Sequence, residues 1–162
     1  SNWTHGNFAR TMAHDPSIRE TIAFKLLFNS CMNPTGALTA QTYGQLLENP
    51  ASRELIVGLA EETLAAYAKA FDYRPADSGR HYVDDVLNKI VFPRAVGHRS
   101  SMLQDLHAGR MTEIDFLNGA IMRLAKEAGL PSARHESILQ LIKACEASGA
   151  FRLEGPDKGQ PS

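Results

Sequence analysis

Three polar residues at intervals of four lie in a strongly apolar segment between Ile22 and Pro34. They are Lys25, Asn29 and Asn33. An α-helix turns by about 100° per residue, so Asn29 lies about 40° and Asn33 about 80° around the helix from Lys25. A helix that is apolar on nearly every other side is expected to be buried. The spacing therefore predicts a buried row in which an ammonium and two amides face a carboxylate, a carbonyl or a hydroxyl.

A purely structural explanation of the row is also open. Lys25 can lay its methylene groups along an apolar surface and send its ammonium to solvent, with Asn29 as an ordinary neighbour one turn away. Asparagine is a mediocre helix former, however, and Asn33-Pro34 is a pair that favours the end of a helix. These costs favour a functional reason for the amides, but the spacing alone does not name the ligand.

Two later segments carry further candidates. Ser100-Ser101 is typical of a helix N-cap, which explains both hydroxyls structurally. Glu113 falls in the first turn of a predicted helix, where a negative charge is stabilised by the helix dipole. Gly119 lies inside that helix and costs roughly 1 kcal/mol relative to alanine, so it indicates the close approach of a second helix or a ligand.

The sequence argues against several other classes of function. Its six histidines have no metal-ligand spacing, and it contains no GxSxG, GxxxxGK[ST] or GxGxxG motif, so we expect no metal site and no nucleotide-binding loop. The formal net charge of −1 predicts no nucleic-acid or acidic-membrane partner. No apolar run has the length of a membrane span, and no signal peptide is evident, so a cytoplasmic protein is the default expectation. Cys31 and Cys145 are expected to be buried thiols.

The elements that must position these residues are all predicted to be helices. Asp15-Pro16, Asn49-Pro50 and Thr112 are helix starts, and Gly109 and Gly129 are helix ends. The predicted helices cover residues 16–32, 42–47, 50–71, 81–90, 100–107, 113–128 and 132–147. We expect an all-α domain over residues 15–151, preceded by a connector or arm (1–14) and followed by a flexible tail (152–162).

Two of these segments together resemble a known family. Lys25 to Pro34 resembles the K-x3-N-x3-N-P signature of the ketopantoate reductase (2-dehydropantoate 2-reductase) family. Residues 100–106, then 109–115 and 118–119, are similar to its second block, S-S-M-L-Q-D followed by T-E-I-D-x-x-N-G. The match spans roughly residues 15–147, and the two motifs occur in the family's order and spacing.

The resemblance implies one half of a two-domain oxidoreductase. Members have an N-terminal Rossmann domain that binds NADPH and a C-terminal multi-helix domain related to that of 6-phosphogluconate dehydrogenase. The active site, which converts ketopantoate to pantoate in pantothenate and coenzyme A biosynthesis, lies between the two domains. This chain resembles the helical half. Its implied partners are a small 2-oxo acid and the Rossmann domain of the same protein; a homodimer and the choice of NADPH over NADH are left open.

The resemblance also implies roles for five residues. Lys25 matches the catalytic lysine, which protonates the keto oxygen as hydride arrives, and Asn29 and Asn33 match the substrate-binding amides. Ser101 matches the serine that binds the substrate carboxylate. Glu113 matches a glutamate near both the lysine and the cofactor, so it is expected to serve catalysis and cofactor binding.

One position departs from the family pattern. Tyr43 stands where the family often has an asparagine that contacts the substrate, which leaves a different 2-oxo acid open as the substrate. A stand-alone, non-enzymatic helical module for ligand binding or dimerisation is the alternative of another class. A GxGxxG strand-turn-helix upstream in the same gene would favour the enzyme.

Overall fold

The computed structural model describes residues 15–153, which form helices and turns without a strand beyond one isolated bridge between Thr42 and Arg99. The predicted all-α class is confirmed over this range. The predicted arm at 1–14 and most of the predicted tail at 152–162 lie outside the described residues. The helices are α2 (Pro16–Thr39), α3 (Tyr43–Glu48), α4 (Pro50–Phe71), α5 (Gly79–His81), the π-helix η1 (Tyr82–Leu87), α6 (Asn88–Arg94), α7 (Ser101–His107), α8 (Asn118–Glu127) and α9 (Ala133–Ser148).

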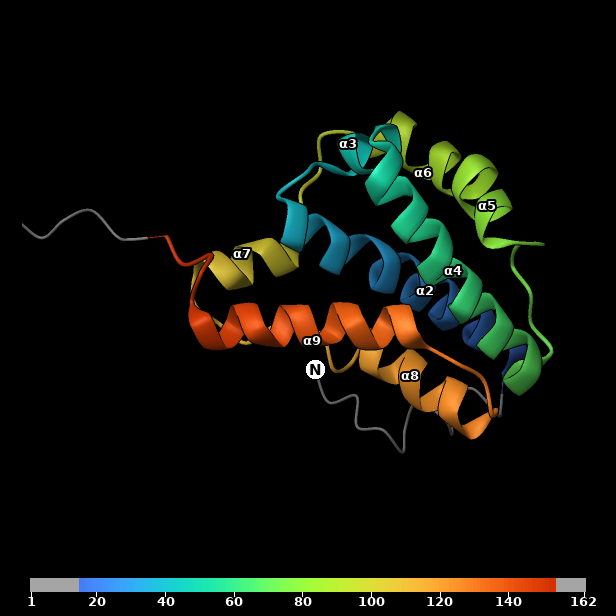
Figure 1. Ribbon diagram of the computed structural model, residues 1–162. Coiled ribbons are helices and arrows are strands. Elements are labelled where there is room, and N and C mark those ends of the chain that lie inside the picture. The colour runs from blue at the N-terminus through green and yellow to red at the C-terminus, as the bar shows by residue number, and fades with distance from the viewer. Residues whose placement is uncertain (1–14, 154–162) are drawn as a thin grey trace, which may run out of the picture.

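Helix α2 is the central element of the fold. It packs against α7, α4 and α9, while α8 lies against α4 and α9 (Figure 1). Ala23, Leu27, Cys31 and Met32 of α2 have no exposed surface. Helices α5, η1 and α6 lie along the outer side of α4, away from α9. The carboxyl-terminal half of α2 is thereby enclosed by elements from both halves of the chain.

The predicted end of the first helix at Met32 is wrong, because α2 continues through Pro34 to Thr39. Proline has no N–H, so the carbonyl of Ser30, four residues earlier, loses its partner within the helix. The side-chain Nδ2 of Asn118 donates to this carbonyl oxygen at 2.9 Å instead. A tertiary hydrogen bond thus replaces the missing helical one, and the helix does not need to stop.

Two further boundaries differ from prediction. The helix expected at 81–90 is a run of α5, η1 and α6 that includes Pro93. The helix expected from Thr112 begins at Asn118, and residues 113–117 form turns. The Thr112 hydroxyl and N–H both bond to Glu146 of α9, at 2.7 and 2.9 Å, so Thr112 attaches the turn to α9. Met111 and Phe116, on either side of Thr112, are 75% and 58% exposed and do not form the hydrophobic staple that often accompanies a helix start.

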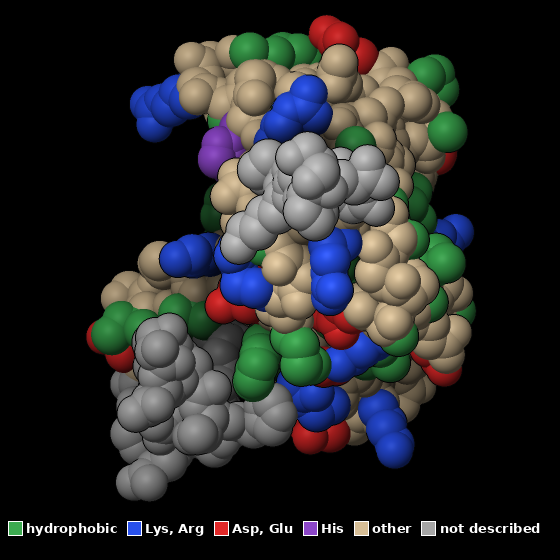
Figure 2. Space-filling model, turned by 90° about the vertical axis from the view of Figure 1, so that its left-hand side faces the viewer, with side chains coloured by type: hydrophobic (Ala, Val, Ile, Leu, Met, Phe, Trp, Pro, Cys, Tyr) green, Lys and Arg blue, Asp and Glu red, His purple; other side chains and the backbone are tan. Residues whose placement is uncertain are grey.

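The surface carries mixed charge. Figure 2 shows the end of the molecule formed by α7 and the last turns of α9, where basic and acidic side chains are interspersed. Arg110 pairs there with Asp105 at 3.0 Å, and Lys143 pairs with Asp115. Among the described helices none is long and apolar enough to cross a membrane.

Candidate functional site

The Lys25, Asn29 and Asn33 row exists on one side of α2, with a gradient of exposure along it. Asn33 is 9% exposed, Asn29 is half-buried and Lys25 is exposed. The expectation that Lys25 is buried is therefore wrong for this chain. Its neighbours Ala23, Leu26 and Leu27 fill the core, which turns the lysine side of the helix outward. Within residues 15–153 the Lys25 ammonium has neither a hydrogen-bond acceptor nor an ion-pair partner.

The two amides of the row are linked to each other and to Tyr43. The Tyr43 hydroxyl donates to Asn33 Oδ1 at 2.7 Å, and Asn33 Nδ2 donates to Asn29 Oδ1 at 3.4 Å. Tyr43 is 4% exposed, and burial raises the pKa of its phenol to about 12. The residue that departs from the family pattern is thus a direct neighbour of the row.

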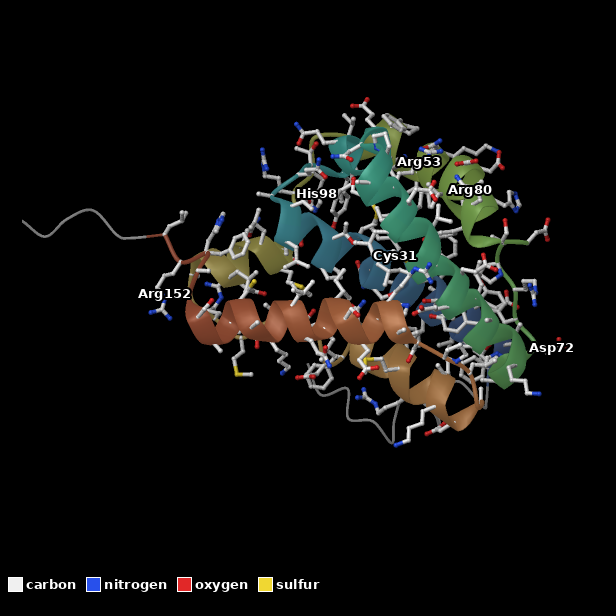
Figure 3. All side chains as sticks on the ribbon, in the orientation of Figure 1. Cys31, Arg53, Asp72, Arg80, His98 and Arg152 are labelled. Atoms are coloured by element: carbon white, nitrogen blue, oxygen red, sulfur yellow. The ribbon has the colours of Figure 1, made fainter. Side chains whose placement is uncertain are left out.

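Local structure around α3 fixes the position of Tyr43. Thr42 and Gln45 form a complete capping box, so α3 begins at Tyr43. The Tyr43 N–H donates to the His98 carbonyl at 2.9 Å, and the Tyr43 ring lies 5.0 Å from the His98 ring and 5.8 Å from that of Phe28. His98 lies near the α3 end of the molecule (Figure 3). One backbone hydrogen bond and two ring contacts thus fix the orientation in which the Tyr43 hydroxyl meets Asn33.

Helix α7 is joined to the same turn of α2 through Ser100. Its hydroxyl donates to the backbone carbonyl of Asn33 at 2.7 Å and accepts from Met102 N–H at 3.2 Å. Ser100 is therefore the N-cap of α7, whereas Ser101 is exposed and makes no cap. Ser101 thus directly follows the residue that contacts Asn33, and its hydroxyl takes no part in the cap.

A buried polar network supports the other side of the row. Asn118 Nδ2 lies 2.9 Å from the Ser30 carbonyl oxygen and 3.1 Å from His135 Nδ1. His135 Nε2 lies 3.0 Å from the Leu59 carbonyl oxygen and 2.9 Å from the Thr63 hydroxyl. With Nδ1 as the acceptor and Nε2 as the donor, a neutral imidazole satisfies the contacts at both of its nitrogens. These hydrogen bonds join α2, α4, α8 and α9 at Ser30, the residue that follows Asn29.

Glu113 lies in the turn that leads into Asn118. Its backbone carbonyl accepts from Phe116 and Leu117 at 2.9 and 3.1 Å, and its side chain is exposed. Among the described residues the Glu113 carboxylate makes no ion pair or hydrogen bond, so this structure does not pair it with Lys25. Both charged groups remain accessible for a ligand or another domain.

The buried imidazole predicts a pH-dependent stability. Burial lowers the pKa of His135 below its usual 6.5, against the opposing effect of nearby Glu62. The unfolded chain therefore takes up a proton near pH 6.5 that the folded chain takes up only at lower pH. The free energy of unfolding should fall as the pH drops below about 6.5, by up to about 1.4 kcal/mol per pH unit. Urea unfolding between pH 5 and 8 measures this slope; His135→Gln should reduce it, and an equal slope in the variant would contradict the assignment.

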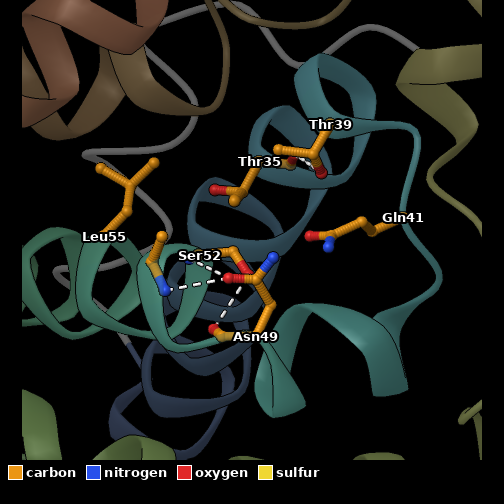
Figure 4. Close-up of a pocket in the computed structure, with 7 residues that line it drawn as sticks. Thr35, Thr39, Gln41, Asn49, Ser52 and Leu55 are labelled. Carbon is orange, nitrogen blue, oxygen red and sulfur yellow. Dashed lines mark hydrogen bonds between the residues drawn. The ribbon is translucent and has the colours of Figure 1, made fainter.

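A hollow at the end of α2 is less suited to chemistry than the row. It has a volume of about 290 Å³ and lies between the end of α2 and the start of α4 (Figure 4). The Thr35, Thr39 and Ser52 hydroxyls that line it donate to the carbonyls of Cys31, Thr35 and Leu46. These three hydroxyls thus serve the helices themselves, whereas the buried Oε1 of Gln41, which also lines the hollow, has no hydrogen-bond partner among the described residues. In the described part of the chain no three His, Cys, Asp or Glu side chains gather as a metal site would require.

Sequence reasoning missed Asn118 and His135, and it gave Tyr43 no structural partner. Asn118 belongs to the second family motif. Pro34 is the signal that could have indicated its role, because a proline in an apolar helix leaves the Ser30 carbonyl in need of another donor. A histidine on an apolar helix face was the corresponding signal for His135. Tyr43 was noticed for its departure from a pattern, but its hydrogen bond to Asn33 depends on a tertiary contact.

Comparison with known proteins gives a consistent result. The family described as "Ketopantoate reductase PanE/ApbA C terminal" matches residues 17–146. A 2-dehydropantoate 2-reductase of Aquifex aeolicus is 34% identical over 147 residues, which cover 86% of this chain and 47% of the relative. The chain spans about half the length of the curated relatives it matches.

Solved structures share the fold. A PanE/ApbA family ketopantoate reductase from Ralstonia eutropha superposes with a TM-score of 0.70 at 27% identity, covering 82% of this chain and 42% of that one. A D-mandelate dehydrogenase in complex with NADH superposes with a TM-score of 0.67 at 26% identity, covering 78% of this chain and 42% of that one. The observed helical arrangement is thus that of a C-terminal portion in longer proteins.

Proposed function

Because the chain belongs to the ketopantoate reductase family and corresponds to the C-terminal portion of its members, we propose that it is the substrate-binding and catalytic half of an NADPH-dependent 2-oxo-acid reductase. The observation that carries the proposal is the row on α2. The Lys25 ammonium, exposed and without a partner among the described residues, lies one turn from the half-buried amide of Asn29. The next amide, Asn33, is held by Tyr43 and Ser100. The relatives named 2-dehydropantoate 2-reductase support ketopantoate, or a close analogue, as the substrate.

The row offers what a 2-oxo acid needs. Asn29 and Asn33 bind the oxygen atoms of the substrate through their amides, and Ser101 at the start of α7 binds its carboxylate. Lys25 directs its ammonium at the keto oxygen, where an alkoxide develops during reduction. A charged donor at that oxygen stabilises the transition state more than the ground state.

Lys25 also completes the proton balance. The carbonyl carbon gains a hydride, and the carbonyl oxygen takes a proton from the Lys25 ammonium, which yields a 2-hydroxy acid and a neutral amine. Solvent reprotonates the amine through the exposed end of the row. A positioned general acid of this kind contributes roughly 10²- to 10⁴-fold to the rate.

The chain itself offers little to a dinucleotide. It contains no GxGxxG loop, and Glu113, exposed and unpaired among the described residues, is the group proposed to face the cofactor beside Lys25. A reduced nicotinamide held beside Lys25 would supply the hydride. The remaining contacts are assigned to a Rossmann domain of the same protein, which would also decide between NADPH and NADH. Dimerisation stays a prediction.

A second candidate is the reduction of a different 2-oxo acid. Two observations favour it: Tyr43 occupies the position beside Asn33, and the D-mandelate dehydrogenase neighbour is similar in fold and sequence. The site chemistry is the same in both cases. The two candidates differ in what lies around the tail of the substrate.

The test uses the protein that carries this chain together with its nucleotide-binding domain. Loss of reduced-nicotinamide absorbance is followed with NADPH or NADH and a panel of 2-oxo acids that includes ketopantoate. We expect turnover with at least one acid, and no turnover by the 162-residue chain alone. If the protein with both domains reduces none of the acids but binds one of them, the result would favour the alternative of a non-enzymatic ligand-binding module.

A further inference from the structure

The segment that leads into Ser101 is attached to the rest of the fold at each of its residues. Residues 98–99 run beside residues 42–43 in an isolated antiparallel bridge, with a backbone hydrogen bond of 2.9 Å. The next residue, Ser100, donates its hydroxyl to the Asn33 carbonyl at 2.7 Å. Three consecutive residues thus have a partner before Ser101, whose backbone is therefore held at one place relative to α2.

Ser100 joins α2 to α7, which pack against each other (Figure 1). Its side chain has no exposed surface, and its one hydroxyl serves both helices. The hydroxyl donates to Asn33 of α2 and accepts from the Met102 N–H of α7 at 3.2 Å. Removing this hydroxyl therefore breaks the connection on both sides, while the neighbouring Ser101 keeps its own hydroxyl.

Gly36 shows how closely the two elements approach each other. It is a buried residue of α2, three positions after Asn33. A Cβ atom on Gly36 would lie 3.2 Å from the Ser100 Cβ, which is tighter than ordinary van der Waals contact. The next nearest atom, Leu46 Cδ1, would lie at 3.5 Å. Glycine inside a helix is unfavourable relative to alanine, and the approach of Ser100 gives a reason for it here.

We propose that Ser100 is a positioning residue for substrate binding: it holds Ser101 in register with the row, so that the Ser101 hydroxyl and the Asn29 amide bind one 2-oxo acid together. The inference rests on the proposed function, in which Ser101 binds the substrate carboxylate. Ser101 is exposed and makes no side-chain hydrogen bond within residues 15–153, so its backbone determines where the hydroxyl lies. A contact that is positioned before the ligand arrives loses less entropy on binding. Ser100 itself is too buried to touch the substrate.

The first test is Ser100→Ala in the protein that carries this chain together with its nucleotide-binding domain. The KM for the 2-oxo acid should rise by about 5- to 20-fold, a part of what one charge-assisted hydrogen bond contributes. The kcat should stay within about threefold of wild type, because the carboxylate is bound equally in the ground state and the transition state.

Ser52→Ala is the matched control. Ser52 is also a buried serine, and its hydroxyl donates to the Leu46 carbonyl at 2.7 Å, away from the row and α7. Both variants lose a buried hydroxyl that makes two hydrogen bonds, so both should lower the melting temperature. The KM should rise in the Ser100 variant alone.

A double-mutant cycle with Ser101→Ala distinguishes positioning from general damage to the site. If Ser100 acts through the Ser101 hydroxyl, its removal has nothing left to misplace once that hydroxyl is gone. Ser100→Ala should then change the KM of the Ser101→Ala protein by less than about twofold. A merely structural role of Ser100 would raise the KM by the same factor in both backgrounds.

Gly36→Ala misplaces the same contact while both serines remain. Its added Cβ must push Ser100 away by a few tenths of an ångström. The KM should rise by about 3- to 10-fold with little change in kcat. Alanine also favours the helix, which opposes the strain of the new contact, so the melting temperature should fall less than in Ser100→Ala. This variant decides the test if Ser100→Ala does not fold.

The outcomes separate the inference from the function on which it rests. An active protein whose KM is unchanged in Ser100→Ala, rises equally in Ser52→Ala, or rises equally in both backgrounds of the cycle overturns the inference and leaves the reductase intact. A wild-type KM in Ser101→Ala removes the carboxylate contact assigned to Ser101, and the inference with it. A wild-type protein that reduces no 2-oxo acid rejects the proposed function and the inference together.

Discussion

Replacing Lys25 with alanine in the full-length protein should lower kcat by about 10²- to 10⁴-fold, with a much smaller change in KM. The ammonium is needed most when the keto oxygen gains negative charge, whereas the amides and Ser101 continue to hold the ground state. Because Lys25 is exposed and makes no ion pair within residues 15–153, its removal should leave the melting temperature nearly unchanged. Steady-state kinetics and thermal unfolding of the same preparation measure both quantities.

Lys69→Ala is the control for the charge change. Lys69 is an exposed lysine in the last turn of α4, so its removal alters the net charge equally without affecting the row. It should leave kcat within about twofold of wild type. Small primary amines added to the Lys25→Ala protein should restore part of the rate, since they supply the missing donor. A loss of only a few-fold in Lys25→Ala would reject the assignment of Lys25 as the proton donor.

The helical class and most helix starts followed from local chemistry. Asp15, Thr42, Asn49 and Ser100 all cap helices as their types predict, because a side-chain oxygen accepts from N–H groups that the helix leaves free. The errors were at prolines and at Thr112. Pro34 stays helical because Asn118, a residue distant in sequence, satisfies Ser30, and Thr112 is engaged by Glu146 instead of starting a helix. Both depend on tertiary partners that spacing does not reveal.

The candidate site was predictable in part for the same reason. Residues on one helix, such as Lys25, Asn29 and Asn33, share a side by geometry alone. The links from Asn33 to Tyr43 and Ser100 cross between helices, and no periodicity indicates them. The exposure of Lys25 was mispredicted because the apolar composition of the segment does not say which side of α2 faces outward.

Asn118→Ala should cost about 2–4 kcal/mol in the free energy of unfolding. One Nδ2 group donates to both the Ser30 carbonyl and His135 Nδ1, and its loss leaves two buried acceptors unpaired. For a domain of this size that loss lowers the melting temperature by roughly 5–15 °C. Thermal and guanidinium unfolding measure it.

A double-mutant cycle with Pro34→Ala tests the reason for this cost. Alanine at position 34 restores the backbone N–H that a regular helix uses to pair the Ser30 carbonyl. In the Asn118→Ala background that N–H replaces the lost side-chain donor, whereas in wild type it competes with a bond already made. Pro34→Ala should therefore stabilise the Asn118→Ala protein by about 1–2 kcal/mol more than it stabilises wild type. Effects that add within about 0.3 kcal/mol would show that Asn118 does not compensate for Pro34, and α2 would need another explanation for passing through a proline beside Asn33.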